Sequence, residues 1–159
     1  MSDFSPFEKR LSALIAALSP AGRRRMTQDI AKTLRTRQQQ RIKAQKAPDG
    51  SAYTPRRHQP ARAKKGRVKR EMFAKLRTNR FMKASGSSDA AVVEFTGKVQ
   101  RIARVHQYGL KDKPGRNGKA VQYPARPLLG LNRSDTEVIE HIIMNHLSLV
   151  DTRSGKSLG

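Results

Sequence analysis

Histidine is the side chain best suited to acid–base chemistry or metal binding at neutral pH, and the sequence has four. His141 and His146 are five residues apart in a segment with helical periodicity, so they lie on different faces and cannot share a metal ion. His58 lies among cationic residues, and His106 follows a short apolar stretch. A lone histidine in either place is interpreted as a packing or hydrogen-bonding residue.

Other catalytic patterns are absent from the sequence. There is no cysteine, which excludes a disulfide framework and a thiolate metal site. The 12 Asp and Glu are dispersed, mostly near expected helix starts, whereas a metal-dependent nuclease needs a cluster of them. No nucleophile elbow and no glycine-rich phosphate loop is present. The sequence therefore predicts a protein that is not an enzyme and has no cofactor and no bound metal.

Positive charge is the strongest physical feature of the sequence. The 159 residues carry a formal net charge of +22, from 34 Lys and Arg against 12 Asp and Glu. Residues 23–83 hold 21 of these cations and three of the acids, a local net charge of +18. Because self-repulsion at this density destabilises a compact chain, the middle segment is expected to face an anionic partner while the ends pack.

The class of this anionic partner stays open between nucleic acid and an acidic protein surface. Only Tyr53 lies among the charges of the basic stretch at about 47–67, which argues against an aromatic platform for single strands. A membrane is disfavoured, since no apolar run approaches the roughly 20 residues needed to span one. The cations assigned to the partner are Arg23, Arg24, Arg25, Arg35, Arg37, Arg41, Arg56, Arg57, Lys64 and Lys65.

Two helices are expected at the N-terminus. Residues 5–18 begin with Ser5 as N-cap, Pro6 at the first helical position and Glu8 completing a capping box. A second, long basic helix is predicted over residues 20–46. Its apolar stripe is thin, so it is expected on a surface or against a neighbouring subunit and not inside a core. The stripe consists of Met26, Ile30, Leu34 and Ile42.

The middle of the chain is predicted to be mostly irregular. A turn at residues 48–50 opens a basic arm over about 47–67, which is expected to be disordered when free. A short helix is predicted over 68–78, and the Ser and Gly residues at 85–88 are interpreted as a break.

The C-terminal half predicts a small antiparallel sheet and a final helix, which makes the fold class α+β. Strands are expected at 90–95 and 120–123, pairing with each other, with a short helix favoured over a strand at 99–107 and a loop at 111–119. Ser134 is the predicted N-cap of an amphipathic helix. Residues 151–159 have little to bury and are predicted to be a disordered tail.

Two sequence segments, in this order, resemble the phage virion morphogenesis family. Its members include the tail completion proteins of contractile-tailed temperate phages. One segment is Met-Phe-Ala-Lys-Leu-Arg at 72–77. The more specific one runs from His-Gln-Tyr-Gly at 106–109 to Tyr-Pro-Ala-Arg-Pro-Leu-Leu-Gly-Leu at 123–131, followed by Asp135 and the amphipathic helix. The resemblance covers about residues 4–150.

The resemblance implies a structural virion protein that completes the head-proximal end of the tail and enables head–tail joining. It implies partners among the phage tail and neck or connector proteins, and a location at the tail–head junction after assembly in the host cytoplasm. Such proteins are similar in general plan to neck proteins, which are small α+β subunits arranged as rings, so a homo-oligomeric ring is expected. One domain over residues 1–150 is expected, with the long basic segment as a departure from a minimal neck subunit.

The loop of the second segment also has a physical interpretation. Gly109 is expected to turn the chain with a positive φ, and Pro124 and Pro127 to hold the next segment extended. The favoured interpretation is that these residues shape the fold. The alternative is contact with the next subunit, where Tyr and Arg are common. The residues assigned to that contact are His106, Tyr108, Gly109, Tyr123, Arg126 and Leu129.

Two functions follow from these observations. One is the neck or tail completion component, whose basic segment reaches acidic proteins or lines the channel of the genome. The other is a sequence-independent nucleic-acid-binding protein in DNA packaging or regulation, which the charge supports and the lack of a recognition helix disfavours.

Overall fold

A computed structural model describes residues 5–56, 71–115 and 118–153 and divides the chain into two compact units. Unit 1 combines residues 1–33, 84–92 and 133–159, and unit 2 combines 34–83 and 93–132. The prediction of a single domain stays a prediction.

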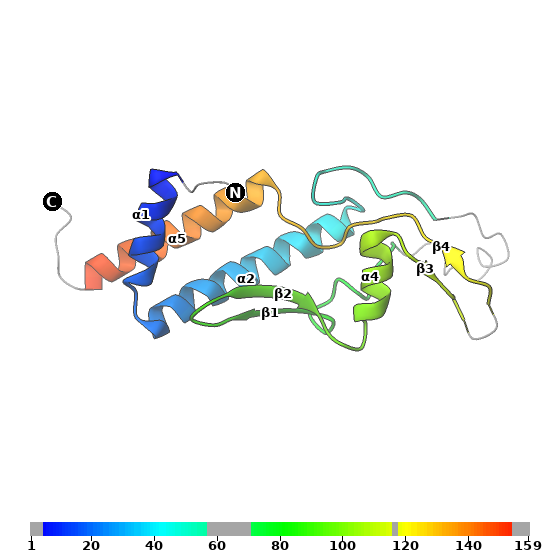
Figure 1. Ribbon diagram of the computed structural model, residues 1–159, viewed down its shortest axis with the longest axis horizontal. Helices are drawn as coiled ribbons and strands as arrows, with labels where there is room; N and C mark the ends of the chain where they lie inside the picture. The colour runs from blue at the N-terminus through cyan, green and yellow to red at the C-terminus, as the bar shows by residue number, and fades with distance from the viewer. Residues whose placement is uncertain (1–4, 57–70, 116–117, 154–159) are drawn as a thin grey trace. The chain divides into compact units, whose positions relative to one another are not determined.

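The described residues confirm the α+β class (Figure 1). In chain order the elements are α1 (Pro6–Ala16), α2 (Pro20–Lys43), β1 (Met82–Gly86), β2 (Ala91–Phe95), α4 (Gln100–Tyr108), β3 (Lys111–Asp112), β4 (Val121–Gln122) and α5 (Arg133–Arg153). None of these helices is long and apolar enough to cross a membrane.

Unit 1 brings together the two ends of the chain, where α1 crosses α5 (Figure 1). The predicted start of α1 is confirmed, because Ser5 Oγ accepts a hydrogen bond from the Glu8 amide at 3.2 Å. The predicted N-cap of α5 is wrong. The helix begins at Arg133, so Ser134 lies inside its first turn. At the other end α5 continues to Arg153, and residues 154–159 of the predicted tail lie outside the described residues.

The tip of the β1–β2 hairpin packs on the first half of α2 in unit 1. Thr27 Oγ1 donates to the Ser87 carbonyl at 2.6 Å, and Arg23 Nε donates to the Ser88 carbonyl at 3.0 Å. Strand β1 occupies part of the segment that was interpreted as a break. That interpretation is wrong for residues 85 and 86, which continue β1, whereas 87 and 88 lie between the two strands. Gly86 serves close packing: a Cβ there would lie 2.6 Å from the Thr27 carbonyl carbon.

The expectation that the apolar stripe of α2 lies on a surface is also wrong. Every fourth residue of the helix from 26 to 42 is buried, which makes a continuous row on one face. Polar Gln38 fits within this row because its Nε2 donates to the Gly130 carbonyl at 2.7 Å. The exposed fractions along the row are 4% for Met26, 7% for Ile30, 9% for Leu34, 3% for Gln38 and 0% for Ile42.

Unit 2 contains a hydrophobic core drawn from distant parts of the chain. Much of this core comes from the basic middle segment, so the expectation that only the ends pack is wrong. Long cationic side chains can stay at the surface while their apolar neighbours are buried. The core residues are Ile42, Ala47, Tyr53, Leu76, Met82, Phe95, Val99, Ala103 and Leu128.

The segment 71–81 is a series of turns and not the predicted helix; residues 68–70 lie outside the described residues. Phe73 has φ +67°, which a helix does not allow. The Gln45 side chain binds both backbone groups of Met72, accepting from its amide at 3.1 Å and donating to its carbonyl at 2.9 Å. A contact 27 residues away therefore replaces local helical hydrogen bonds.

The predicted pairing of the strands is wrong as well. β2 pairs with β1, while β4 forms a separate antiparallel hairpin with β3, opposing Lys111 to Gln122 and Asp112 to Val121. The helix favoured over 99–107 is confirmed as α4. The part of the basic arm that the structure describes folds back on unit 2: Tyr53 is buried and its hydroxyl donates to the Pro127 carbonyl at 2.9 Å.

Candidate interaction site

Helix α4 and the loop over residues 123–131 form one assembly in unit 2. The helix ends at Gly109, whose φ is +65°, as predicted. A Cβ at this position would lie 2.7 Å from the Ala125 amide nitrogen. Glycine is therefore required twice, for the left-handed turn and for the close approach of the loop.

Gln107 fastens the loop to α4. Its Oε1 accepts from the amides of Leu128 and Leu129 at 2.8 and 2.9 Å, and its Nε2 donates to the Leu129 carbonyl at 2.8 Å. The Arg126 amide adds a bond of 2.7 Å to the His106 carbonyl. Backbone groups of the loop that have no strand partner thus form hydrogen bonds with Gln107 and His106 of α4. These bonds hold the loop in one conformation.

Arg126 is 6% exposed and is bound within unit 2. Its Nε donates to the Thr54 carbonyl at 2.7 Å and its Nη2 to the Pro55 carbonyl at 3.2 Å. Burial, and then the nearby Arg56, lower the pKa of the guanidinium from its usual value. The side chain ties the start of the basic arm to the loop, which matches the favoured interpretation of a fold-shaping residue.

His106 lies in a row of ring contacts. Its ring centroid is 4.9 Å from that of Phe73 and 5.1 Å from that of Tyr123, both edge-on, and Phe73 also contacts Tyr53 at 5.6 Å. The imidazole Nδ1 is buried without a hydrogen-bond partner. Within the described ranges, no group of three or more His, Cys, Asp or Glu residues could hold a metal ion.

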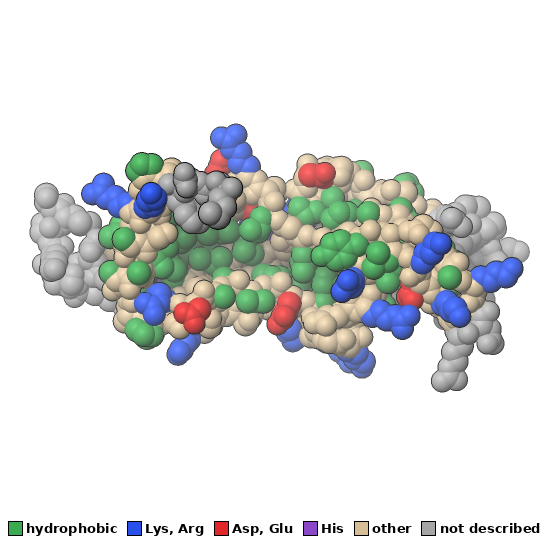
Figure 2. Space-filling view, in the orientation of Figure 1, with side chains coloured by type: hydrophobic (Ala, Val, Ile, Leu, Met, Phe, Trp, Pro, Cys, Tyr) green, Lys and Arg blue, Asp and Glu red, His purple; other side chains and the backbone are tan. Residues whose placement is uncertain are grey.

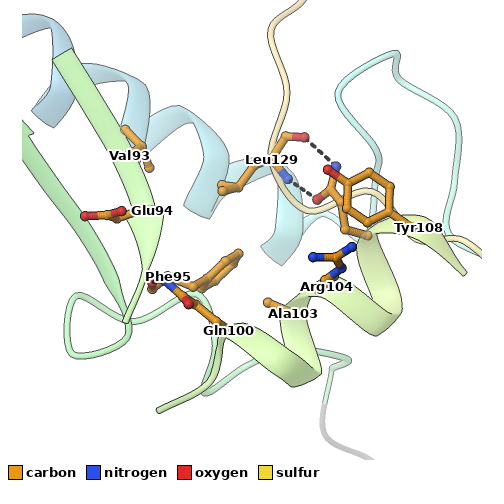
Figure 3. Close-up of a pocket in the computed structure, with 9 residues that line it drawn as sticks. Val93, Glu94, Phe95, Gln100, Ala103, Arg104, Tyr108 and Leu129 are labelled. Atoms are coloured by element: carbon orange, nitrogen blue, oxygen red, sulfur yellow. Dashed lines mark hydrogen bonds between the residues drawn. The ribbon is translucent and has the colours of Figure 1, made fainter. Parts of the chain in front are cut away.

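An open groove of about 430 Å³ lies between β2, α4 and the loop (Figure 3). Phe95 from β2 and Leu129 from the loop extend toward the same space, and Ala103, Arg104 and Tyr108 come from α4. Tyr108 is 66% exposed beside it. The lining is mixed: apolar side chains lie beside the charged residues Glu94 and Arg104 and the amides of Gln100 and Gln107. Such a composition is common on protein-binding surfaces.

The sequence profile of the phage virion morphogenesis family matches residues 2–148. The curated protein "Tail completion protein S" of Escherichia phage P2 is 53% identical over 148 residues, which are 92% of this chain and 99% of that relative. The chain belongs to the phage virion morphogenesis family. No solved structure matches it.

In this family member, the residues expected to contact a neighbouring subunit fall into two sets. Tyr108 and Leu129 line the groove and can meet another molecule, and Gly109 supports them. His106 and Tyr123 contact each other inside the ring row, and Arg126 is buried. Sequence reasoning missed the groove residues of β2, and Ala103 and Arg104 of α4, although the alternation of Val93 and Phe95 in β2 placed these two on one face.

The cations expected to bind an anionic partner also differ in what they contact. Arg24, Arg25 and Arg56 are exposed, whereas Arg35 and Arg37 are half-buried. Two others bind the chain's own carbonyl groups. Arg23 Nη1 donates to Leu18 O at 2.7 Å, and Arg41 Nη2 donates to Gly130 O at 3.0 Å. Arg57, Lys64 and Lys65 lie outside the described residues.

Figure 2 shows Lys and Arg side chains projecting at the surface, with fewer acidic side chains among them. Arg24 and Arg25, which are exposed on α2, remain the described arginines of this set best placed for an external anion. Binding of such a partner by this family member stays a prediction.

Acidification should weaken the folded state through His106. Burial lowers the pKa of this imidazole below 6.5, and Arg126 and then Arg56 act in the same direction against a smaller opposite effect of Asp112. Below pH 6.5 the imidazole takes up a proton more readily in the unfolded chain than in the folded chain. The free energy of unfolding therefore decreases as the pH is lowered. Above pH 6.5 both states are neutral and the effect vanishes.

The measurement is urea unfolding of the wild type and of His106→Phe at pH 7.5 and pH 5.5. The variant keeps an aromatic ring and removes the proton site, so it should lose less stability between the two pH values than the wild type. Equal losses in the two proteins would contradict the assignment of this pH dependence to His106.

Proposed function

We propose that this protein is a structural virion component that completes the head-proximal end of a phage tail and enables the tail to join a filled head. The observation that carries the proposal is the 53% identity to the P2 protein named "Tail completion protein S", which extends over 99% of that relative. An identity of this size along the whole length supports a shared role and not only a shared fold. The rigid loop and its groove supply a surface for protein contacts, and we assign the chain no catalytic step.

The proposal extends to the partners and the location of the protein. Its contacts are with phage tail and neck or connector proteins, at the tail–head junction of the virion, after assembly in the host cytoplasm. The subunits form a homo-oligomeric ring, since a tail end is a circular structure that cyclic symmetry matches. Tyr108 and Leu129 in the groove are the described residues of the predicted contact set that we assign to such contacts.

The cationic surface has two roles consistent with this function. It binds acidic faces of neighbouring proteins, or it lines the passage of the genome and contacts phosphates without reading bases. The second role needs no recognition helix. The alternative of a packaging or regulatory DNA-binding protein rests on the charge alone.

The experiment is electron microscopy of lysates from a phage that carries a deletion of this gene alone. Filled heads and separate, full-length tails should accumulate, and a plasmid copy of the gene should restore joined particles. Empty heads in the deletion lysate would reject tail completion in favour of a packaging role. Normal joined particles would reject both.

A further inference from the structure

A second cationic surface lies in unit 2, outside the residues 23–83 that hold most of the excess charge. The rest of the sequence is close to balanced, with 13 Lys and Arg against nine acids. Six of these 13 cations nevertheless fall in the described residues 98–115 and 118–122, where Asp112 is the single acid. All six are exposed: Lys98, Arg101, Arg104, Lys111, Lys113 and Lys119.

The β3–β4 hairpin, which carries three of these cations, is fixed to the end of α4. Its register places Lys111 opposite Gln122. The Tyr123 amide donates to the Leu110 carbonyl at 3.1 Å, and Gln122 Nε2 donates to the Gly109 carbonyl at 2.6 Å. The base of the hairpin is therefore held in place before any partner arrives.

The acid of the hairpin is already paired. Asp112 Oδ1 lies 2.7 Å from Arg101 Nη2 of α4, and the Asp112 side chain is only 20% exposed. Because successive side chains of a strand point to opposite faces, Lys111 points away from this ion pair. No described residue forms an ion pair with Lys111, Lys113 or Lys119, which we call the hairpin lysines. In Figure 2, Lys and Arg side chains gather over the part of unit 2 that contains β3 and β4.

The composition of the hairpin favours phosphates over a protein as the anionic partner. Protein interfaces depend on a few large side chains buried in pockets, and residues 111–120 contain no apolar side chain larger than proline. The exposed Tyr108 and Leu110 precede the hairpin. Lysine binds phosphate as a point charge and needs no such pocket.

The shape of the hairpin fits the same partner. A two-stranded ribbon is narrow enough for the major groove of B-DNA, which is about 12 Å wide. At Gly115 a Cβ would meet nothing within 4 Å, so the loop is open to solvent there. Small residues at such a place allow another backbone to approach closely.

We propose that the hairpin lysines bind the phosphate backbone of double-stranded DNA without reading its sequence. The contact lies outside the cations of residues 23–83. It rests on the proposed function for the source of the DNA, which is the genome passing the tail–head junction.

The test measures binding of a short DNA duplex by fluorescence anisotropy over a range of salt concentrations. The variant Lys111→Ala/Lys113→Ala/Lys119→Ala should bind more weakly than the wild type. The slope of log affinity against log salt should become shallower by about 2.7, since each lost phosphate contact removes about 0.9. The loss should be the same on duplexes of different sequence, because phosphate contacts carry no sequence information.

The matched control is Lys9→Ala/Arg10→Ala/Arg133→Ala, which removes the same number of charges from exposed positions of unit 1. Its salt slope should equal that of the wild type. Equal slopes in the control and in the hairpin variant would overturn the proposal, because the effect would then follow from net charge alone.

A charge-retaining variant separates loss of charge from damage to the hairpin. Lys111→Arg/Lys113→Arg/Lys119→Arg should keep the affinity and the salt slope of the wild type. A loss as large as that of the alanine variant would show that positive charge at these positions does not bind DNA, and the proposal would fail.

Polyglutamate serves as the probe for an acidic protein surface. Its binding should differ little between the alanine variant of the hairpin and the control. If the alanine substitutions weakened polyglutamate binding as much as duplex binding, the hairpin would be a site for acidic protein and the assignment to DNA would be wrong. Tail completion is judged by the deletion lysate and not by DNA affinity, so either proposal can fail alone.

Discussion

Replacing Gln107 with leucine should lower the free energy of unfolding by about 2–5 kcal/mol, since each part-buried backbone group left unpaired costs about 1–3 kcal/mol. The leucine has a similar volume but can neither accept from the amides of Leu128 and Leu129 nor donate to the Leu129 carbonyl. Leu128 is only 1% exposed, so water cannot readily replace the lost partner there. Urea unfolding followed by circular dichroism measures the change.

Gln100→Leu is the matched control for this prediction. Gln100 lies on the same helix and makes a single side-chain bond, 3.2 Å long, to the Phe95 carbonyl. Its replacement should cost no more than about 1 kcal/mol, the usual net contribution of one hydrogen bond. If both variants lost the same stability, Gln107 would not be the residue that fastens the loop.

Local signals in the sequence predicted the start of α1 and the end of α4. The cap at Ser5 acts within four residues, so it determines the start of α1 without help from the rest of the chain. Gly109 is a similar case, because its left-handed backbone conformation ends α4 whatever the helix packs against. Both predictions required only neighbouring residues.

Long-range contacts explain the errors. The turns at 71–81 depend on Gln45, which binds the backbone of Met72 from a distant part of the chain. Strand β1 was missed because its Ser and Gly residues have low strand propensity, and a glycine is needed where β1 meets α2. No pattern within a window of ten residues contains this information.

The candidate site was predicted only in part, for a related reason. The sequence shows which residues are cations but not which of them bind the chain's own carbonyl groups, as Arg23 and Arg126 do. Arg126 was therefore assigned to a neighbouring subunit, although its guanidinium lies within unit 2. Tyr108 was recognised from the motif, while its partner in the groove, Phe95, became evident only from the packing of β2 beside α4.

Gly86→Ala should lower the free energy of unfolding by about 3 kcal/mol, the upper end of the range for overpacking. A Cβ at this position would lie 2.6 Å from both the carbonyl carbon and Oγ1 of Thr27. The backbone of α2 cannot rotate away as a flexible side chain can. The hairpin tip must therefore move off the helix, which also stretches the 2.6 Å bond between Thr27 Oγ1 and the Ser87 carbonyl.

Gly97→Ala serves as the control for a glycine whose Cβ would meet nothing within 4 Å. Because alanine restricts the unfolded chain more than glycine does, this variant should be neutral or gain up to about 1 kcal/mol. Thermal unfolding of the two variants beside the wild type measures the contrast. A Gly86→Ala protein as stable as Gly97→Ala would mean that β1 does not pack against α2 at this distance. Loss of stability in Gly86→Ala alone would support close packing as the reason for glycine at this position.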